Sequence, residues 1–600
     1  MDNKGDKYLK AIDFNCTKIN DKLWKKRIET IRDVTIPGCF KRCEETGRIS
    51  NFHKAAKKIE GGFEGVYFND SDVYKIIEGV GYVLSQVEDR ELEEYTDDLI
   101  HTIVDAQQKD GYLNTYFTLV KNEEKWTDME RHEDYCIGHL IEAAISYYKA
   151  TGKDRLLKAV IRAVDEFYTE MITGGRNWVP GHQEIELALI KLYDETKDRK
   201  YLEFSKWLLE QRGHGHGVGE NLWGVEKWGA VYAQDEKPIK EMTDISGHAV
   251  RAMYMYCAMA DLLITDGNYD YLHALVKLWD STVLRNMYLT GGIGSSKENE
   301  GFTRDYDLPN DTAYCETCAS VGMVMWNHRM NLIFGESKYA DIMERSIYNG
   351  ALSGMGEQGD VYFYVNPLES DGTHHREPWF DVSCCPTQIT RFVPSIGQYM
   401  YAVDEDNIYV NLFIKSDSRF NFASDNIRIT QSTDYPWDGR VLINIEQSIE
   451  EEFNINLRCP SWCKDFQLMI NGRPFKDYYV EKGYIKIYRI WEKSTQIILN
   501  MDMETEIVKP HPRVLNNKGK VALMRGPLVY CFESVDQIDY DKLTISGSEE
   551  FKLEFDEELV GGIVKISLYE KDEFKAMAVP YYAWDNRKAG KMKVWVDEAK

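Results

Sequence analysis

The stretch LIEAAISYYKATGKDRLLKAVIRAVDEFY, residues 140–168, decides the fold. Apolar residues recur every three or four positions on both sides of a turn at Gly152, which predicts two amphipathic helices running antiparallel. The same unit returns three more times, and two further helical segments precede it. We therefore predict a toroid of about six helical hairpins. The repeats are residues 185–211, 253–283 and 324–352, and the preceding segments are residues 73–86 and 91–108.

The apolar period changes from 3.6 to 2 after about residue 400. Short strands such as NIYVNLFIKS and RVLINIEQ alternate with turn signals such as Asn471-Gly472, which predicts an antiparallel β-sandwich. A further run of strands from about residue 520 predicts a second, smaller β-sandwich. The predicted chain is a multidomain α+β protein with domains at residues 1–400, 401–508 and 509–600.

Charge and composition exclude several kinds of partner. The chain has 73 Lys plus Arg against 99 Asp plus Glu, a net charge of −26, which argues against nucleic acid and anionic membrane surfaces. The N-terminus MDNKGDKYLKAIDF lacks the apolar run of a secretory signal, and no later stretch is long and apolar enough to span a membrane. We expect a cytoplasmic protein that acts on a small neutral substrate. The 12 cysteines should then be free thiols.

Four residues in two distant segments form a candidate zinc site. Glu316 and Cys318 lie in AYCETC, and Cys384-Cys385 lies far downstream in SCCPTQ. Zn²⁺ accepts thiolate and carboxylate ligands in tetrahedral sites. Two adjacent cysteines cannot share an ion from a regular helix, so we expect an irregular turn ended by Pro386. The alternatives are a vicinal disulfide or inert buried thiols.

Other polar groups surround this candidate site in the sequence. Glu300, in the Gly-rich loop GGIGSSKENEG, is a candidate proton carrier or simply a surface glutamate. Cys315 offers a fifth thiol that we expect to point away. The pair His374-His375 is expected in a solvated loop.

A Gly-His step recurs at three equivalent repeat positions. These steps contain His139, His182 and His248. A single histidine near the start of a helix usually caps or packs, but three such histidines indicate one polar pocket.

The segments TGGIGSSKENEGFTRDYDLPNDTAYCETCASVGM and SCCPTQITR resemble the bacterial β-L-arabinofuranosidases of glycoside hydrolase family 127, formerly a family of unknown function. The resemblance runs over nearly the whole chain and implies an (α/α)6 barrel followed by β-sandwich domains. It also implies an exo-acting, zinc-dependent, retaining hydrolase that releases β-linked L-arabinofuranose from small plant-derived oligosaccharides or glycoconjugates.

The same resemblance implies a role for each candidate residue. Cys384 would be the nucleophile and Glu300 the general acid/base. Zn²⁺ would be held by Glu316, Cys318, Cys384 and Cys385. The sugar would contact His139, His182, His248, Tyr364 and Glu316.

Two other functions stay open from the sequence. A related glycosidase could cleave another furanoside or an acidic pectic sugar, with Arg251 or Arg304 against the sugar carboxylate. A non-catalytic, zinc-stabilised carbohydrate-binding protein is the second alternative. A homodimer is compatible with either.

Overall fold

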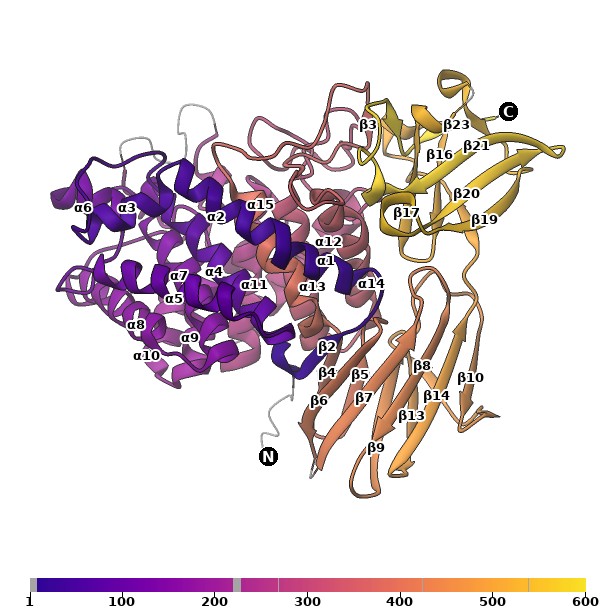
Figure 1. The fold of residues 1–600 in the computed structure, drawn as a ribbon, viewed down its shortest axis with the longest axis horizontal. Coiled ribbons are helices and arrows are strands. Elements are labelled where there is room, and N and C mark those ends of the chain that lie inside the picture. Colours follow the sequence, from indigo (N-terminus) through magenta and orange to yellow (C-terminus); the bar gives the residue numbers. More distant parts are fainter. Residues whose placement is uncertain (1–7, 220–227, 268, 424, 538, 600) are drawn as a thin grey trace.

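The computed structural model describes residues 8–599 except 220–227, 268, 424 and 538. Residues 1–7 and Lys600, which the sequence places in the first and last domains, lie outside the described part. Figure 1 shows a helical part, drawn from indigo to magenta, followed by two groups of strands in orange and yellow. The predicted multidomain α+β chain, with a helical N-terminal part and β-rich domains after it, is confirmed.

Six helices of the described residues form a closed inner ring, in which each helix contacts the next and the last contacts the first. They are α4 (Asp70–Gln86), α7 (Glu133–Thr151), α9 (Ile185–Thr196), α11 (Ala249–Asp266), α13 (Thr317–Phe334) and α15 (Cys384–Phe392). The α-helices of the described residues outside this ring are α1 (Trp24–Thr30), α2 (Ile36–Glu45), α3 (Arg48–Ala55), α5 (Arg90–Asp105), α6 (Thr115–Leu119), α8 (Arg155–Tyr168), α10 (Arg199–Glu210), α12 (Leu272–Arg285) and α14 (Ser337–Arg345). The predicted hairpins therefore build an (α/α)6 barrel. In the part of the chain that the structure describes, no helix is both long and apolar enough to cross a membrane.

Glycines set where the inner helices end and how closely they pack. Gly152, Gly267 and Gly335 follow α7, α11 and α13 in the left-handed conformation, with φ of 75°, 65° and 58°. Inside α4, a Cβ at Gly79 would lie 2.5 Å from the Thr390 carbonyl oxygen of α15, and one at Gly81 would lie 2.3 Å from Ser146 Oγ of α7. The two glycines thus let α4 approach both neighbours at backbone distance.

The middle part contains two sheets. The strand order of the first sheet is β1 (Lys10–Ala11), β4 (Tyr401–Val403), β5 (Asn407–Val410), β9 (Glu451–Arg458), β13 (Tyr484–Trp491) and β12 (Tyr479–Glu481). The strand order of the second sheet is β11 (Arg473–Pro474), β10 (Phe466–Ile470), β14 (Ser494–Met501), β8 (Arg440–Glu446), β7 (Asp425–Thr433), β6 (Ser416–Phe422) and β2 (Thr17–Ile19). The N-terminal strands β1 and β2 are edge strands, one in each sheet. The pair β5 and β9 is parallel, because the chain crosses to the other sheet for β6, β7 and β8 before it returns.

The C-terminal strands join into a further sheet. Along its main path these are β18 (Thr544–Ile545), β23 (Val596–Glu598), β16 (Lys520–Arg525), β17 (Leu528–Glu533), β21 (Glu573–Pro580), β20 (Ile563–Glu570) and β19 (Glu550–Asp556). Off this path lie β15 (Thr505–Val508), β22 (Met592–Lys593) and β3 (Glu369–Ser370), which comes from the long loop before α15. The three domain ranges stay a prediction, and β1, β2 and β15 pair across their limits.

Candidate active site

A pocket of about 310 Å³ opens at the N-terminal ends of the inner helices. This volume is at the small end of the range for ligand sites, which suits a single sugar ring better than a chain. The N-terminal ends of the inner helices carry partial positive charge towards it. Side chains at or near these helix starts line the pocket, among them Ser71, Tyr135, His182, Arg251, Cys318 and Cys384.

The four predicted zinc ligands meet on one side of this pocket. Cys384 Sγ lies 3.5 Å from Glu316 Oε1 and 3.9 Å from Cys385 Sγ. Cys385 Sγ lies 3.6 Å from the same carboxylate oxygen and 3.5 Å from Cys318 Sγ. One donor atom from each of the four residues lies within 4.8 Å of all the others.

The expected irregular turn at Cys384-Cys385 is wrong, because both cysteines begin helix α15. Glu316 is likewise the residue before α13, and Cys318 lies in the first turn of that helix. Two helix starts therefore face each other across the cluster. A first helical turn has no preceding turn to cover its side chains, so adjacent residues there can reach one point.

These donors fit a tetrahedral ion. With Zn–S bonds of about 2.3 Å and a Zn–O bond of about 2.0 Å, the edges of the tetrahedron are about 3.5 to 3.8 Å long. The four contacts of 3.5 to 3.9 Å between these donor atoms match these edges. Glu316 Oε1 is the carboxylate oxygen that faces the sulfurs, whereas Oε2 is buried and has no hydrogen-bond partner among the described residues.

The thiols of the cluster differ in acidity. Hydrogen bonds from Cys318 and then Cys385 hold the pKa of Cys384 well below its ordinary value, against the effect of burial. Burial raises the pKa of Cys318 and of Cys385 well above the ordinary value. Cys384 is also the one member of the cluster that is not fully buried. The Cys384 thiol therefore loses its proton more easily than the other two thiols of the cluster, and it lines the pocket.

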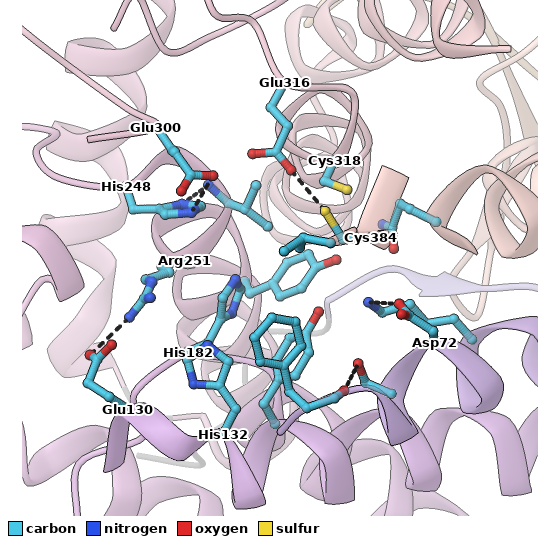
Figure 2. Close-up of a pocket in the computed structure, with 18 of the residues that line it drawn as sticks. Asp72, Glu130, His132, His182, His248, Arg251, Glu300, Glu316, Cys318 and Cys384 are labelled. Atoms are coloured by element: carbon cyan, nitrogen blue, oxygen red, sulfur yellow. Dashed lines mark hydrogen bonds and ion pairs between the residues drawn. The ribbon is translucent and has the colours of Figure 1, made fainter. Parts of the chain in front are cut away.

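Glu300 faces the pocket from the side opposite Cys384, with the Glu316 carboxylate above and between them in the view of Figure 2. Tyr314 Oη donates to Glu300 Oε2 over 3.0 Å, and His248 Nε2 lies 3.6 Å from the same atom. Burial acts to raise the pKa of Glu300, but His248 and Tyr314 outweigh it and hold the pKa below its ordinary value.

Three imidazoles cover the pocket wall below Glu300. His248 accepts the Val250 N–H at its Nδ1, so Nε2 carries the proton that points towards Glu300. The His182 ring lies 5.6 Å from the His248 ring and 5.9 Å from the His132 ring. Burial lowers the pKa of His182 and of His132 well below the ordinary value, so both rings are neutral.

His139 does not line the pocket. It sits inside α7, fully buried behind Tyr135, whose ring centroid is 4.5 Å away. Its Nδ1 lies 3.1 Å from Glu184 Oε1. The Gly-His signal therefore brings His182 and His248 to the pocket, whereas His139 reaches it only through Tyr135.

The remaining predicted residues lie as follows. Tyr364 Oη is 3.1 Å from Cys384 Sγ. Cys315 is buried and faces Gly292, and it is not part of the cluster of Glu316 with the three other cysteines. His374 and His375 are directed to other partners, Val365 O at 2.9 Å and Asp585 Oδ1 at 2.7 Å, so the pair ties the long loop to the C-terminal sheet.

Several lining residues were missed by sequence reasoning. They include Tyr67, Asp72, Lys75, Glu130, His132, Tyr232, Tyr254 and Gln388. Tyr254 lies one turn inside a helix that His248 precedes, so the helical period of four was the signal that could have found it. Gln388 could not be found in this way, because a turn and not a helix was expected at Cys384. Glu130 and His132 lie just before α7 and carry no motif of their own.

A helical barrel with a small pocket that is lined by carboxylates, imidazoles and thiols fits a glycoside hydrolase. Three family models match in succession, described as the catalytic domain of the GH127 β-L-arabinofuranosidases over residues 17–398, the GH127 middle domain over 407–503 and the C-terminal domain of glycoside hydrolase family 127 over 505–597. The chain belongs to glycoside hydrolase family 127.

Individual members of this family are similar to the chain over more than 90% of its length. A non-reducing end β-L-arabinofuranosidase of Bifidobacterium longum subsp. longum is 32% identical, with 91% of this chain and 92% of that protein covered. The crystal structure of a GH127 β-L-arabinofuranosidase from Geobacillus stearothermophilus T6 is 38% identical with a TM-score of 0.93, covering 97% and 100% of the two chains. A structure described as a GH127 β-arabinofuranosidase is 37% identical with a TM-score of 0.92, covering 99% and 98%.

Proposed function

We propose that the protein is an exo-acting, retaining glycoside hydrolase that releases β-linked L-arabinofuranose from the non-reducing end of small plant-derived oligosaccharides or glycoconjugates. The observation that carries this proposal is the placement of Glu300 and Cys384 on opposite sides of one small pocket. The names of the similar proteins support the choice of sugar. The size of the pocket supports removal of one terminal residue at a time.

Cys384 is the proposed nucleophile. Its sulfur attacks the anomeric carbon, a C–S bond forms as the glycosidic C–O bond breaks, and Glu300 gives its proton to the leaving oxygen. In the second step Glu300 takes a proton from water, the water oxygen bonds to the same carbon, and the sulfur leaves as thiolate. Two inversions at one carbon give a product of retained configuration.

Glu316, Cys318, Cys384 and Cys385 are the proposed zinc ligands. A bound Zn²⁺ would keep the Cys384 sulfur deprotonated and better able to leave at the second step. The protein contributes the placement of that sulfur, because Cys384 is fixed at the start of α15 and Tyr364 Oη lies against it. Glu316 retains a free oxygen that can also accept from a sugar hydroxyl.

Glu300 has to change its protonation state during the cycle. Its low pKa leaves it ionised in the free protein, as the base of the second step requires. A sugar that fills the pocket displaces water from this carboxylate, and the added desolvation raises its pKa towards the protonated form that the first step requires.

The proposed sugar contacts follow the pocket wall. His182, His248 and Tyr364 present imidazole or phenol groups to the cavity. His139 is proposed to orient Tyr135 from behind. Location in the cytoplasm and a homodimer stay predictions.

The acidic-sugar alternative rests on two arginines, and neither is placed to bind a sugar carboxylate. The Arg251 guanidinium faces Glu130, with Nη1 3.6 Å from Oε1. Arg304 is 87% exposed and does not line the pocket. The two arginines that the sequence offered therefore give no support to an acidic sugar.

The test combines metal analysis with hydrolysis of p-nitrophenyl β-L-arabinofuranoside. The purified protein should contain zinc and release the sugar, with the first product seen by proton NMR in the β configuration. Cys384→Ser should abolish turnover, and Glu300→Gln should lose activity but keep the metal. Full activity in metal-free Cys384→Ser protein would contradict the proposal. The binding-protein alternative would be established if the zinc-loaded wild-type protein binds arabinose but does not cleave arabinofuranosides.

A further inference from the structure

The floor of the pocket carries a hydrogen-bond donor that the chain leaves without an acceptor. Gln388 lies on α15 one turn after Cys384, lines the pocket and is 1% exposed. Arg391 Nε donates to its side-chain oxygen over 2.7 Å. Because a guanidinium has only donors, the atom facing it must be Oε1, which fixes the orientation of the amide. The Nε2 group therefore points the other way, and it has no partner among the described residues.

A second donor at the floor is fixed by the same arginine. Arg391 Nη2 donates to Tyr254 Oη over 3.1 Å, and Arg391 Nη1 is anchored on Glu78 Oε2 over 2.8 Å. The phenol oxygen of Tyr254 thus accepts from arginine and keeps its own proton for another acceptor. Tyr254 also lines the pocket.

Lys75 adds a third donor group from α4. Its ammonium is 2% exposed and lies 4.0 Å from Asp72 Oδ1, at the outer limit of an ion pair. The other wall of its site is the face of the Tyr135 ring, 5.1 Å from Nζ. An ammonium has three donors, and this one lines the same pocket. The buried Gln388 amide, which has no acceptor among the described residues, calls for a ligand that brings an oxygen atom, and Tyr254 and Lys75 lie beside it with donors of their own.

We infer that Gln388 binds the sugar: its side-chain amide donates to a hydroxyl oxygen on the side of the ring away from the leaving group, and Tyr254 and Lys75 complete a floor of donors. Cys384 and Gln388 are four residues apart on one helix face, so the attacking sulfur and the hydroxyl anchor are held at a fixed spacing. This inference rests on the proposed function and adds a specificity residue to it.

A competing role for the amide is to hold a water molecule. A small cavity of about 20 Å³ lies beside the pocket and is bordered by Gln388, Arg391 and Ser395. This volume is sufficient for one water. If the amide donates there, Gln388 supports the barrel and does not touch the sugar.

The experiment compares Gln388→Leu, Gln388→Glu and Ser395→Ala with the wild-type holoenzyme. Gln388→Glu keeps the oxygen that Arg391 needs and removes the donors. Ser395→Ala alters the small cavity and removes the hydrogen bond from Ser395 Oγ to Phe392 O, but leaves Gln388 in place. We expect both Gln388 variants to lose about ten- to a hundredfold in kcat/KM with zinc content and Tm retained, and Ser395→Ala to keep wild-type kinetics. Recovery of activity in Gln388→Glu would overturn the inference, because it would reduce the role of Gln388 to anchoring Arg391.

Monodeoxy arabinofuranosides identify the contacted hydroxyl. The wild-type enzyme should cleave the analogue without the contacted hydroxyl more slowly than the parent arabinofuranoside. The Gln388 variants, which have already lost this contact, should cleave that analogue and the parent compound at similar rates. If every deletion costs the same factor in wild type and variants, the inference is wrong. If the wild-type protein cleaves no arabinofuranoside, the proposed function fails separately. In that case the affinity for L-arabinose is measured by calorimetry in place of the kinetics. If the wild-type protein and the Gln388 variants bind L-arabinose equally well, or if the wild-type protein does not bind it, the inference is overturned too.

Discussion

Tyr314→Phe should make Glu300 a weaker acid. Tyr314 is buried, and its hydroxyl donates to Glu300 Oε2 over 3.0 Å. A hydrogen bond to a charged group contributes about 1.5 to 3 kcal/mol, and the Glu300 side chain is 36% exposed, so we take the lower end. At about 1.4 kcal/mol per pKa unit, the pKa of Glu300 should rise by about one unit.

The sign of the kinetic effect follows from the proposed acid role of Glu300. The first chemical step needs the protonated carboxyl, and the low pKa of Glu300 makes this form the minority at neutral pH. A higher pKa increases the protonated fraction and shifts the alkaline limb of the kcat/KM profile upward by about one pH unit.

The assay is the pH dependence of kcat/KM on p-nitrophenyl β-L-arabinofuranoside, with zinc content measured alongside. Tyr288→Phe is a matched control, because Tyr288 is a buried tyrosine near the Gly-rich loop that does not line the pocket. An alkaline limb that stays in place in Tyr314→Phe, or moves downward, would refute this reasoning about Glu300.

Three further substitutions test the metal site, the barrel and a buried acid. Cys318→Ser should lower the zinc content, measured by elemental analysis, below one ion per chain and should lower the Tm. The control Cys315→Ser, whose thiol lies outside the cluster, should keep the wild-type zinc content and Tm. Gly81→Ala should cost about 2 kcal/mol in urea unfolding, because the new Cβ would meet Ser146 at 2.3 Å; an unchanged midpoint would show that the helices can separate freely. Burial raises the pKa of Glu133 to about 8, so its neutral carboxyl adds stability at low pH that is lost as the pH rises towards 8. The free energy of unfolding should therefore fall less between about pH 5 and pH 8 in Glu133→Gln than in the wild-type protein, as measured by urea unfolding. An equal fall in the two proteins would contradict a raised pKa of Glu133.

The helical hairpins could be predicted because their signal is local. A period of 3.6 on both sides of Gly152 fixes two helices and the turn between them, and the repeat of this unit gives the toroid. The pairing of β1 with β4 and of β2 with β6 could not be predicted, because it joins two or three residues near the N-terminus to strands about 400 positions away. Such short edge strands have no periodicity of their own.

The site was partly predictable for the same reason. Cys384 and Cys385 stand out by their chemistry, but their place in the first turn of a helix depends on how α15 packs between α4 and α13. The Gly-His repeat predicted three pocket residues, yet His139 falls inside its helix while His248 stands before one. The role of Gln388 depends on Arg391 and Tyr254, which only the closed ring brings together.

The central claim is that the sulfur of Cys384 becomes bonded to the sugar. The most direct measurement is mass spectrometry of the rapidly quenched, zinc-loaded enzyme during turnover of an activated β-L-arabinofuranoside, followed by mapping of the modified peptide. The proposed reaction predicts a mass increase of one pentosyl group on the peptide that contains Cys384, absent from Cys384→Ser. A pentosyl group on another residue, or turnover by Cys384→Ser at the wild-type rate, would contradict it.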